Sequence, residues 1–373
     1  MTRPSLAIVL LMAVAGLLIN PAHAVQPTAS AASQVTNFHN LVRLLAIGAQ
    51  QQKRTAIRGT DGWMFFVPEL RALTVGPFWG DRSTSVSRAS NKRYADPLEP
   101  ITDFHRQLKR AGIRLLVVPV PAKVSVYPER VAQNISFGSA DARKKTSPPR
   151  LDIHHQAFHK LLVARGVEVV DLLPVFLEQR HDRRGPLYCK TDTHWSGRGV
   201  DVAATAILKS IGKPKWLRNL PLRKSISHTQ PITITGDLAR TLNADKPVRE
   251  TLPLTFVGQA KRGGRPVPTP LSRTSPVLVM GDSHTLVFHD PTLHAAGAGL
   301  PDHVAAGLGL AVDLVGVRGS GATATRISLL RRRDNLKGKK LVIWCFSIRE
   351  YTESFSGWRV VPVIRRQTNP QPP

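Results

Sequence analysis

The sequence predicts an α/β fold in which helices cover both faces of a mostly parallel β-sheet. Residues 113–121 form a continuous apolar run and residues 167–173 a second, largely apolar one, the pattern of strands that are buried on both faces. Each run follows a segment with helical apolar spacing that ends in a glycine, Gly112 or Gly166. This alternation is typical of parallel sheets, because parallel strands need a crossover connection, usually a helix.

The first half of the chain contributes three helices to this arrangement. The first opens near Pro100, the second spans about residues 151–165, and the third covers residues 200–211. Ahead of them, residues 25–57 are expected to form a linker and a short helix. The Gly-, Ser- and Arg-rich residues 76–95 are expected to form a loop.

The second half begins with a break in this pattern. Residues 213–274 are rich in Pro and Thr and contain only short β-like pieces, so we interpret them as a β- and loop-rich insertion. Buried-strand patterns return at residues 277–280 and end with residues 341–346. The expected organisation is one domain over residues 58–358 and a frayed Pro-rich tail at residues 359–373.

The N-terminus has the pattern of a targeting segment. Arg3 precedes an apolar run at residues 6–18, and a small-x-small site follows at residues 22–24. The run is short for a transmembrane helix. We therefore expect residues 1–24 to be a signal peptide of an exported protein, with an uncleaved signal anchor as the alternative.

The composition is strongly basic. The 373 residues include 52 Lys and Arg against 25 Asp and Glu, which gives a formal net charge of +27. Such a charge favours anionic surroundings such as an acidic polysaccharide, a wall polymer or anionic lipid. The export signal and the scatter of the basic residues argue against nucleic acid. A solvated basic surface without a specific partner is the plain alternative.

The cysteines and histidines predict no metal site or cofactor. Cys189 and Cys345 are two cysteines in an exported chain, so a disulfide and two free thiols are both open. No cysteine or histidine spacing fits a zinc template. His284, His289 and His294 lie close in sequence but are expected to be solvent-facing or hydrogen-bonded.

A candidate nucleophile follows the strand pattern at residues 277–280. The strand stops at Gly281, and Ser283 comes two residues later. This position lies at the carboxyl end of the sheet, where ligands of open α/β folds bind. Asp282 is expected to be structural, accepting backbone N–H bonds in the turn. Ser283 would need a base and an orienting acid to act as a nucleophile.

Asp192 and His194 can supply that acid and base. On an extended segment, side chains two residues apart point the same way, and the polar loop before the third helix provides such a segment. Asp171, at the end of a predicted strand, is a rival acid, but no histidine lies near it in the sequence. The expected geometry places His194 within hydrogen-bond reach of Ser283, with Asp192 behind it.

Several separated motifs resemble the SGNH-hydrolase-like domain of the alginate O-acetyltransferases AlgJ and AlgX. They occur in the family's order over roughly residues 58–355 of this chain. The quoted segments are TDTHWS at residues 191–196, MGDSH at 280–284, GTDGWMF at 59–65, the glycine-to-proline stretch 112–128 and FSIRE at 346–350.

The resemblance implies an SGNH-like α/β/α sandwich that is circularly permuted, because the Asp/His block precedes the Ser block. It implies that Ser283 is the nucleophile that becomes acetylated, that His194 is the general base and acid, and that Asp192 orients His194. The implied activity is O-acetylation of an exopolysaccharide or envelope glycan, anionic and alginate-like. A membrane-bound O-acyltransferase would supply the acetyl group. The implied location is the periplasm, close to the inner membrane.

The resemblance also suggests further site residues. The Ser283 backbone N–H and the loop with Gly319 and Ser320 are candidates for an oxyanion hole. Arg349 could bind a substrate carboxylate or the acyl donor, or form a structural ion pair with Glu350 or another acid.

Three other residues near the motifs have two interpretations each. Lys123 and Tyr127 would line the mouth of the cleft, or be plain loop residues. Trp195 would pack to fix the His194 loop, or serve as a sugar platform.

Two other functions fit the same residues. An acetylesterase would use the same three side chains and differ only in accepting water. A non-catalytic glycan-binding or assembly subunit would not need them, and the presence of Asp192, His194 and Ser283 together argues against that alternative.

Overall fold

A computed structural model describes residues 31–133, 135, 149–260 and 264–365. The expected signal peptide, residues 1–24, lies outside these ranges. No helix within them has the length and apolar character needed to span a membrane.

The core is a five-stranded, fully parallel sheet with the strand order β4-β3-β10-β8-β9, which confirms the predicted fold class. Its strands are β3 (Arg114–Val120), β4 (Glu168–Val169), β8 (Val277–Gly281), β9 (Asp313–Gly316) and β10 (Leu341–Ser347). Strands β3, β8 and β10 are almost entirely buried, as their continuous apolar runs predict.

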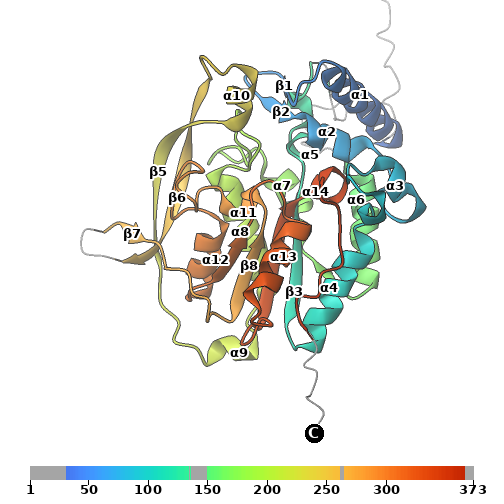
Figure 1. The fold of residues 1–373 in the computed structure, drawn as a ribbon. Helices are drawn as coiled ribbons and strands as arrows, with labels where there is room; N and C mark the ends of the chain where they lie inside the picture. Colours follow the sequence, from blue (N-terminus) through green and yellow to red (C-terminus); the bar gives the residue numbers. More distant parts are fainter. Residues whose placement is uncertain (1–30, 134, 136–148, 261–263, 366–373) are drawn as a thin grey trace, which may run out of the picture.

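Helices cover both faces of this sheet (Figure 1). The covering helices are α4 (Leu98–Arg110), α6 (Ile153–Ala164), α8 (Gly197–Ile211), α12 (Leu300–Leu308) and α13 (Thr323–Arg332). On one face, Phe104 of α4 meets Trp344 of β10 edge-on, and the Arg326 guanidinium of α13 lies 5.3 Å from the centroid of the same ring. Helices α8 and α12 pack against each other on the opposite side.

Short elements occupy the segments between these helices and strands. They are β1 (Ala56–Arg58), β2 (Met64–Phe66), α2 (Val67–Thr74), α5 (Lys123–Val126), η3 (Pro128–Arg130), α7 (Leu173–Gln179), α11 (Ser283–Leu286) and α14 (Glu350–Glu353). The segment at residues 76–95, expected to be a loop, contains the helical turns η1 (Gly80–Arg82), α3 (Ser83–Val86) and η2 (Lys92–Tyr94).

The N-terminal segment differs from the expected linker and short helix. Helix α1 (Ala31–Gln51) runs for 21 residues and buries Phe38, Val42 and Ala46. Their spacing of four places them on one face of the helix, and α1 packs along α2. The segment is therefore part of the folded core.

The insertion at residues 213–274 is more regular than its short β-like pieces indicate. Strands β5 (Ile226–Thr235) and β6 (Arg249–Ala260) form a long antiparallel pair, and β7 (Pro266–Val267) adds to its edge. The short helices α9 (Lys215–Arg218) and α10 (Asp237–Leu242) complete it. Helix α10 sits in the connection between β5 and β6, at the upper end of the pair in Figure 1.

The beginning of the expected tail is ordered against the core. Val361 and Val363 are buried, and Gln107 of α4 donates its side-chain N–H to the Val361 carbonyl at 2.9 Å. Residues 366–373 lie outside the described ranges. Cys189 and Cys345 are both buried and free, and burial raises the pKa of each thiol well above its ordinary value.

Candidate active site

Ser283 is the first residue of α11, directly beyond the carboxyl end of β8. Asp282 fixes this turn: its Oδ1 accepts the His284 backbone N–H at 2.9 Å and its Oδ2 accepts that of Ser347 at 2.8 Å. Gly281 lies so close to the Cys345 carbonyl of β10 that a Cβ atom would collide with it. The strand pairing therefore holds the turn, and Asp282 has the structural contacts expected from the sequence.

The structure brings Ser283, His194 and Asp192 together. His194 Nε2 lies 2.8 Å from Ser283 Oγ, and His194 Nδ1 lies 2.6 Å from Asp192 Oδ1. Because a carboxylate only accepts, Nδ1 carries the proton and Nε2 can accept from the Ser283 hydroxyl. All three residues are buried, with Ser283 9% exposed. This is the hydrogen-bonded geometry that the two sequence motifs predict.

Electrostatics favour a basic imidazole at His194. Burial lowers the pKa of His194, but the Asp192 carboxylate outweighs it, so the pKa lies above its ordinary value. Burial raises the pKa of Asp192, but the two imidazoles beside it outweigh that effect and hold the pKa well below its ordinary range. Asp192 is therefore ionised near neutral pH.

A second histidine, His294, contacts the same carboxylate. Its Nε2 donates to Asp192 Oδ2 at 2.9 Å. His294 has a φ of +80°, a left-handed conformation that is uncommon for residues other than glycine. Sequence reasoning missed this role, because His294 lies 102 residues from Asp192 in a loop without a motif.

The insertion also contributes to the site, through α10. Asp237, the first residue of α10, donates its backbone N–H to Asp192 Oδ2 at 2.9 Å. The Asp237 carboxylate accepts the Thr193 backbone N–H at 2.7 Å and the Thr193 hydroxyl at 2.8 Å. The loop that carries Asp192 and His194 is thus fixed from the insertion side. No motif in the sequence marks Asp237, so this contact could not be predicted from the sequence.

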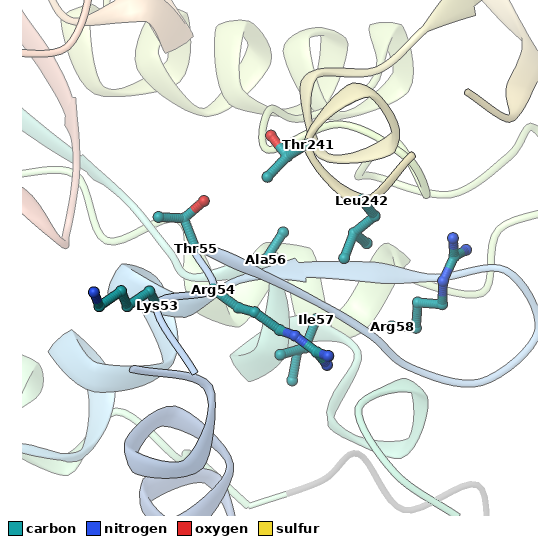
Figure 2. Close-up of a pocket in the computed structure, with 8 residues that line it drawn as sticks. All are labelled: Lys53, Arg54, Thr55, Ala56, Ile57, Arg58, Thr241 and Leu242. Atoms are coloured by element: carbon teal, nitrogen blue, oxygen red, sulfur yellow. The ribbon is translucent and has the colours of Figure 1, made fainter. Parts of the chain in front are cut away.

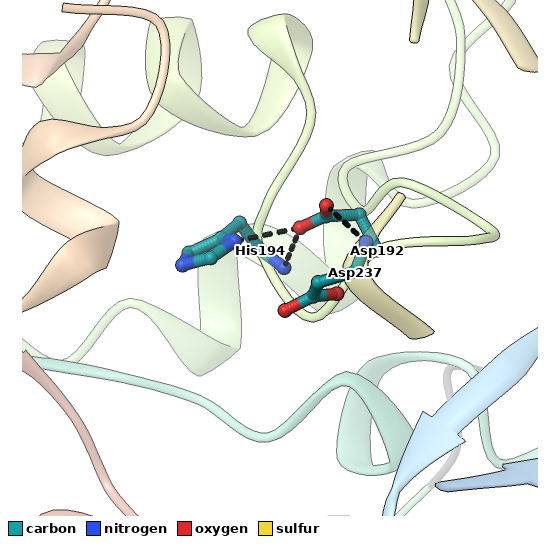
Figure 3. A group of neighbouring side chains, drawn as sticks. All are labelled: Asp192, His194 and Asp237. Atoms are coloured by element: carbon teal, nitrogen blue, oxygen red, sulfur yellow. Dashed lines mark hydrogen bonds and ion pairs between the residues drawn. The ribbon is translucent and has the colours of Figure 1, made fainter. Parts of the chain in front are cut away.

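Asp192, His194 and Asp237 also form a possible metal-ligand set, with ligand atoms within 4.8 Å of one another (Figure 3). However, both oxygens of Asp192 and both oxygens of Asp237 already accept hydrogen bonds. His194 uses its two ring nitrogens toward Asp192 and Ser283. A cation would have to displace these bonds, so we interpret the cluster as a hydrogen-bond network.

Lys123 lies beneath the site, and its expected place at a cleft mouth is wrong. Its side chain is fully buried. Its Nζ donates hydrogen bonds to the backbone carbonyls of Met64 at 2.9 Å and Asp192 at 2.5 Å, which compensate for the loss of water. Burial lowers the pKa of Lys123, and nearby Glu69 opposes that shift. Lys123 therefore joins β2 to the loop that carries Asp192.

Tyr127 is buried as well, and among the described residues it makes no hydrogen bond to Ser283. Its own hydroxyl donates to the Arg180 carbonyl at 3.0 Å and accepts the Leu187 N–H at 2.8 Å. Its ring packs on Trp63, with centroids 4.4 Å apart. Both rings line a hollow of about 400 Å³ whose lining includes neither Ser283 nor His194. Tyr127 thus supports the fold at a neighbouring hollow.

Trp195 packs rather than presenting a sugar platform. It is fully buried, and its ring meets that of His284 edge-on, with centroids 5.6 Å apart. His284 is fully buried in turn, and burial lowers its pKa to about 4. The His284 ring lies 4.8 Å from that of His194. A neutral ring here avoids a second positive charge beside the His194 imidazole.

The loop proposed for the oxyanion hole lies beside Asp282. Gly321 packs against Asp282 and Phe346, and the Ala322 N–H points to Glu350 Oε2 at 3.3 Å. Ser320 donates its N–H to the Val317 carbonyl at 3.3 Å and buries its hydroxyl without a hydrogen-bond partner. Among the described residues, no hydrogen bond joins Gly319 or Ser320 to Ser283. Their oxyanion role stays a prediction.

Arg349 forms an ion pair with Glu69, an acid that the sequence does not single out. Arg349 Nη1 lies 3.3 Å from Glu69 Oε1, and its guanidinium lies 5.4 Å from the centroid of the Phe66 ring. Glu69 is buried in α2, and burial raises its pKa against the lowering effect of Arg349. Of the five N–H donors of Arg349, only one has a partner among the described residues.

Three remaining acids and histidines are accounted for structurally. Asp171 pairs with Arg150 at 2.9 Å and caps Leu173, so it does not serve His194. His289 pairs with Asp302 at 2.9 Å. Glu350, close to Asp282, has its pKa raised to about 8, first by burial and then by the Asp282 charge.

A family model described as "SGNH hydrolase-like domain, acetyltransferase AlgX" matches residues 56–348. A curated relative, the probable alginate O-acetylase AlgJ of Pseudomonas syringae pv. tomato, is 26% identical over 197 residues. That match covers 53% of this chain and 44% of the relative, so the chain spans less than half the length of this relative.

Two solved structures share the fold. The O-acetyltransferase domain of Pseudomonas putida AlgJ superposes with a TM-score of 0.56 at 21% identity, covering 80% of this chain and 92% of that one. Pseudomonas aeruginosa AlgX gives a TM-score of 0.56 at 14% identity, covering 83% and 66%.

Proposed function

Because this chain belongs to the family of AlgX-type acetyltransferases with an SGNH hydrolase-like domain, we propose that it is an O-acetyltransferase that acts on a polysaccharide. The proposal names Ser283 as the nucleophile, His194 as the base and Asp192 as the orienting acid. The observation that carries it is the pair of contacts at His194, 2.8 Å to Ser283 and 2.6 Å to Asp192.

The first half-reaction would load Ser283. Ser283 Oγ attacks the acetyl carbonyl carbon of the donor, and His194 Nε2 takes the hydroxyl proton. When the tetrahedral intermediate collapses, the bond to the donor's oxygen or sulfur breaks. The leaving group then takes the proton from His194. The products are acetyl-Ser283 and the deacetylated donor.

The second half-reaction would transfer the acetyl group. A sugar hydroxyl attacks the acetyl-Ser283 carbonyl and gives its proton to His194. The bond to Ser283 Oγ then breaks, and Oγ takes that proton back. Because water can replace the sugar, transfer requires that the site hold the acceptor or exclude water. The burial of His194 and Ser283 supports this requirement.

Negative charge develops on the carbonyl oxygen in both steps and needs fixed donors. The Ser283 backbone N–H, at the start of α11, is one candidate. The Arg349 guanidinium is another, because most of its donors have no partner among the described residues. Its charge is also close enough to Asp282 and His194 to influence their pKa values.

The proposal includes a cellular setting, which the sequence motifs and the family resemblance support. The chain would be exported through residues 1–24 and work in the periplasm near the inner membrane. A membrane-bound O-acyltransferase would supply the acetyl groups. The formal charge of +27 suits an anionic acceptor such as alginate.

The test is Ser283→Ala, measured with a simple acetyl ester and oligosaccharide acceptors. The wild type should gain one acetyl group on Ser283 by mass spectrometry and acetylate the sugar. The variant should lose both activities by roughly a thousandfold or more. Acetylation that survives in Ser283→Ala would sink the proposal, and acetate release without sugar acetylation would favour the acetylesterase alternative.

A further inference from the structure

A hollow of about 590 Å³ lies between the end of α1, strand β1 and the end of α10 (Figure 2). Its lining is formed by the consecutive residues 53–58 and by Thr241 and Leu242 of α10. In Figure 2, Leu242 projects from α10 toward β1, Arg54 lies beside the start of the strand, and Arg58 projects from its other end. The hollow therefore has one wall from the N-terminal segment and one from the insertion.

The charges around this hollow have one sign. Lys53, Arg54 and Arg58 are all exposed, and no acidic residue of the described ranges belongs to the lining. Within the described ranges, none of the three side chains has an ion pair or a hydrogen bond. Other arginines of the chain do have partners: Arg71 pairs with Glu353, and Arg130 with Asp61. Three unpaired cations around one concave surface repel each other and attract an anion.

Helix α10 connects this hollow to the candidate active site. Its first residue, Asp237, donates to Asp192, and its last residue, Leu242, lines the hollow. A helix of six residues spans roughly 9 Å, a short distance on the scale of a polysaccharide. Leu242 also packs in a small apolar cluster with Phe66, whose ring lies under Arg349. Helix α10 therefore contacts both the hollow and the loop that carries Asp192 and His194.

We propose that this cationic hollow, formed by Lys53, Arg54 and Arg58, is a subsite for carboxylate groups of an acidic polysaccharide acceptor. The proposal rests on the proposed function. It adds the place on the protein where the acceptor binds and the charges that bind it. A polymer bound here by a carboxylate would extend along α10 and present a hydroxyl at Ser283. Exposed charges of this kind act through screened attraction, so the binding weakens as salt rises.

The experiment compares two charge-matched triple variants. Lys53→Gln/Arg54→Gln/Arg58→Gln removes the hollow's three charges. Arg331→Gln/Lys337→Gln/Lys340→Gln removes three exposed charges from the end of α13 and the segment before β10. Each is assayed with a uronic-acid oligosaccharide and with the same oligosaccharide after reduction of its carboxyls to alcohols.

The hollow variant should raise KM for the acidic acceptor by roughly tenfold and flatten the dependence of KM on salt. Its KM for the reduced acceptor and its rate of Ser283 acetylation by a simple ester should stay unchanged. The control variant should behave like the wild type. A Lys53→Arg/Arg54→Lys/Arg58→Lys variant, which keeps the charges, should retain at least half of the wild-type affinity.

An unchanged KM for the acidic acceptor in the hollow variant would overturn the subsite. So would an equal rise in KM for both acceptors, because a carboxylate subsite cannot act on a neutral sugar. Loss of binding to vesicles with anionic lipid, with KM unchanged, would assign the hollow to a membrane surface instead. Failure of wild-type Ser283 to acetylate would refute the proposed function itself, a separate outcome.

Discussion

At the scale of single residues, Asp192 is the point where the candidate site converges. Its Oδ1 accepts two N–H groups from His194, and its Oδ2 accepts one from Asp237 and one from His294. Four donors saturate the carboxylate. Its orientation is therefore fixed by the loop, the insertion and the segment after β8 together. The hydrogen bond from His194 Nδ1 to this fixed carboxylate in turn orients the His194 ring.

We expect His294→Ala to slow acetylation of Ser283 by roughly 10- to 100-fold, the range for losing a hydrogen bond to a buried charge. His294→Asn retains a side-chain N–H and should recover part of the rate. Stopped-flow acylation with an acetyl ester measures both. His289→Ala, which removes a histidine bonded to Asp302 instead, is the matched control. A rate for His294→Ala equal to that of the control would show that His294 does not position Asp192.

The protonation of His194 predicts a pH profile. His194 must be neutral to accept the Ser283 proton, and Asp192 holds its pKa above the ordinary value. Acylation should therefore rise with pH and reach its plateau only above about pH 6.5, the ordinary histidine value. In Asp192→Asn the rate should fall, and the midpoint should move to lower pH. If the midpoint of the pH profile does not move in Asp192→Asn, the group that titrates is not His194.

At the scale of elements, helix α6 carries two histidines into a buried aromatic cluster. His155 has no hydrogen-bond partner on either ring nitrogen and packs 5.1 Å from Phe78, centroid to centroid. His159 lies 3.4 Å from the Tyr351 hydroxyl. Burial lowers the pKa of His155 well below its ordinary value and that of His159 to about 4. Both are neutral in the folded protein near pH 6.

This cluster predicts a loss of stability in mild acid. Below about pH 6.5 the unfolded chain protonates these histidines while the folded protein does not. The free energy of unfolding should therefore fall as pH drops from 7 toward 4. Denaturant unfolding of the wild type and His155→Leu measures the effect. The variant has no ring nitrogen to protonate, so its pH dependence should be shallower. If the free energy of unfolding depends equally on pH in the wild type and in His155→Leu, His155 does not contribute to the loss of stability in acid.

The strands and motifs were predictable from the sequence, and the contacts between distant segments were not. Strands β3 and β10 appear as continuous apolar runs because both of their faces are buried. The hairpin β5–β6 appears only as fragments, since much of it is exposed and Pro231 pairs opposite Pro253. Asp192, His194 and Ser283 stand out through local motifs. Glu69, Asp237 and His294 acquire their roles only through tertiary contacts.

At the scale of the whole molecule, the candidate site combines side chains from segments that lie far apart in the sequence. Helix α2 supplies Glu69, the segment before α8 supplies Asp192 and His194, α10 supplies Asp237, and the segment after β10 supplies Arg349. These elements meet at the carboxyl edge of one parallel sheet, where α/β folds place their ligands. The insertion is therefore part of the site through Asp237 of α10, although the sequence pattern predicts it only as an addition to the α/β core.

The position of β10 has a consequence for the order in which the molecule can form. It is the last strand along the described part of the chain, yet it lies between β3 and β8 at the centre of the sheet. The facing edges of β3 and β8 stay unpaired until residues 341–347 have been synthesised. The Ser347 N–H that holds Asp282, next to Ser283, arrives with the same strand. A growing chain, or one shortened before residue 341, thus lacks this support for Ser283, so we expect its reactivity to emerge only once residues 341–347 are in place.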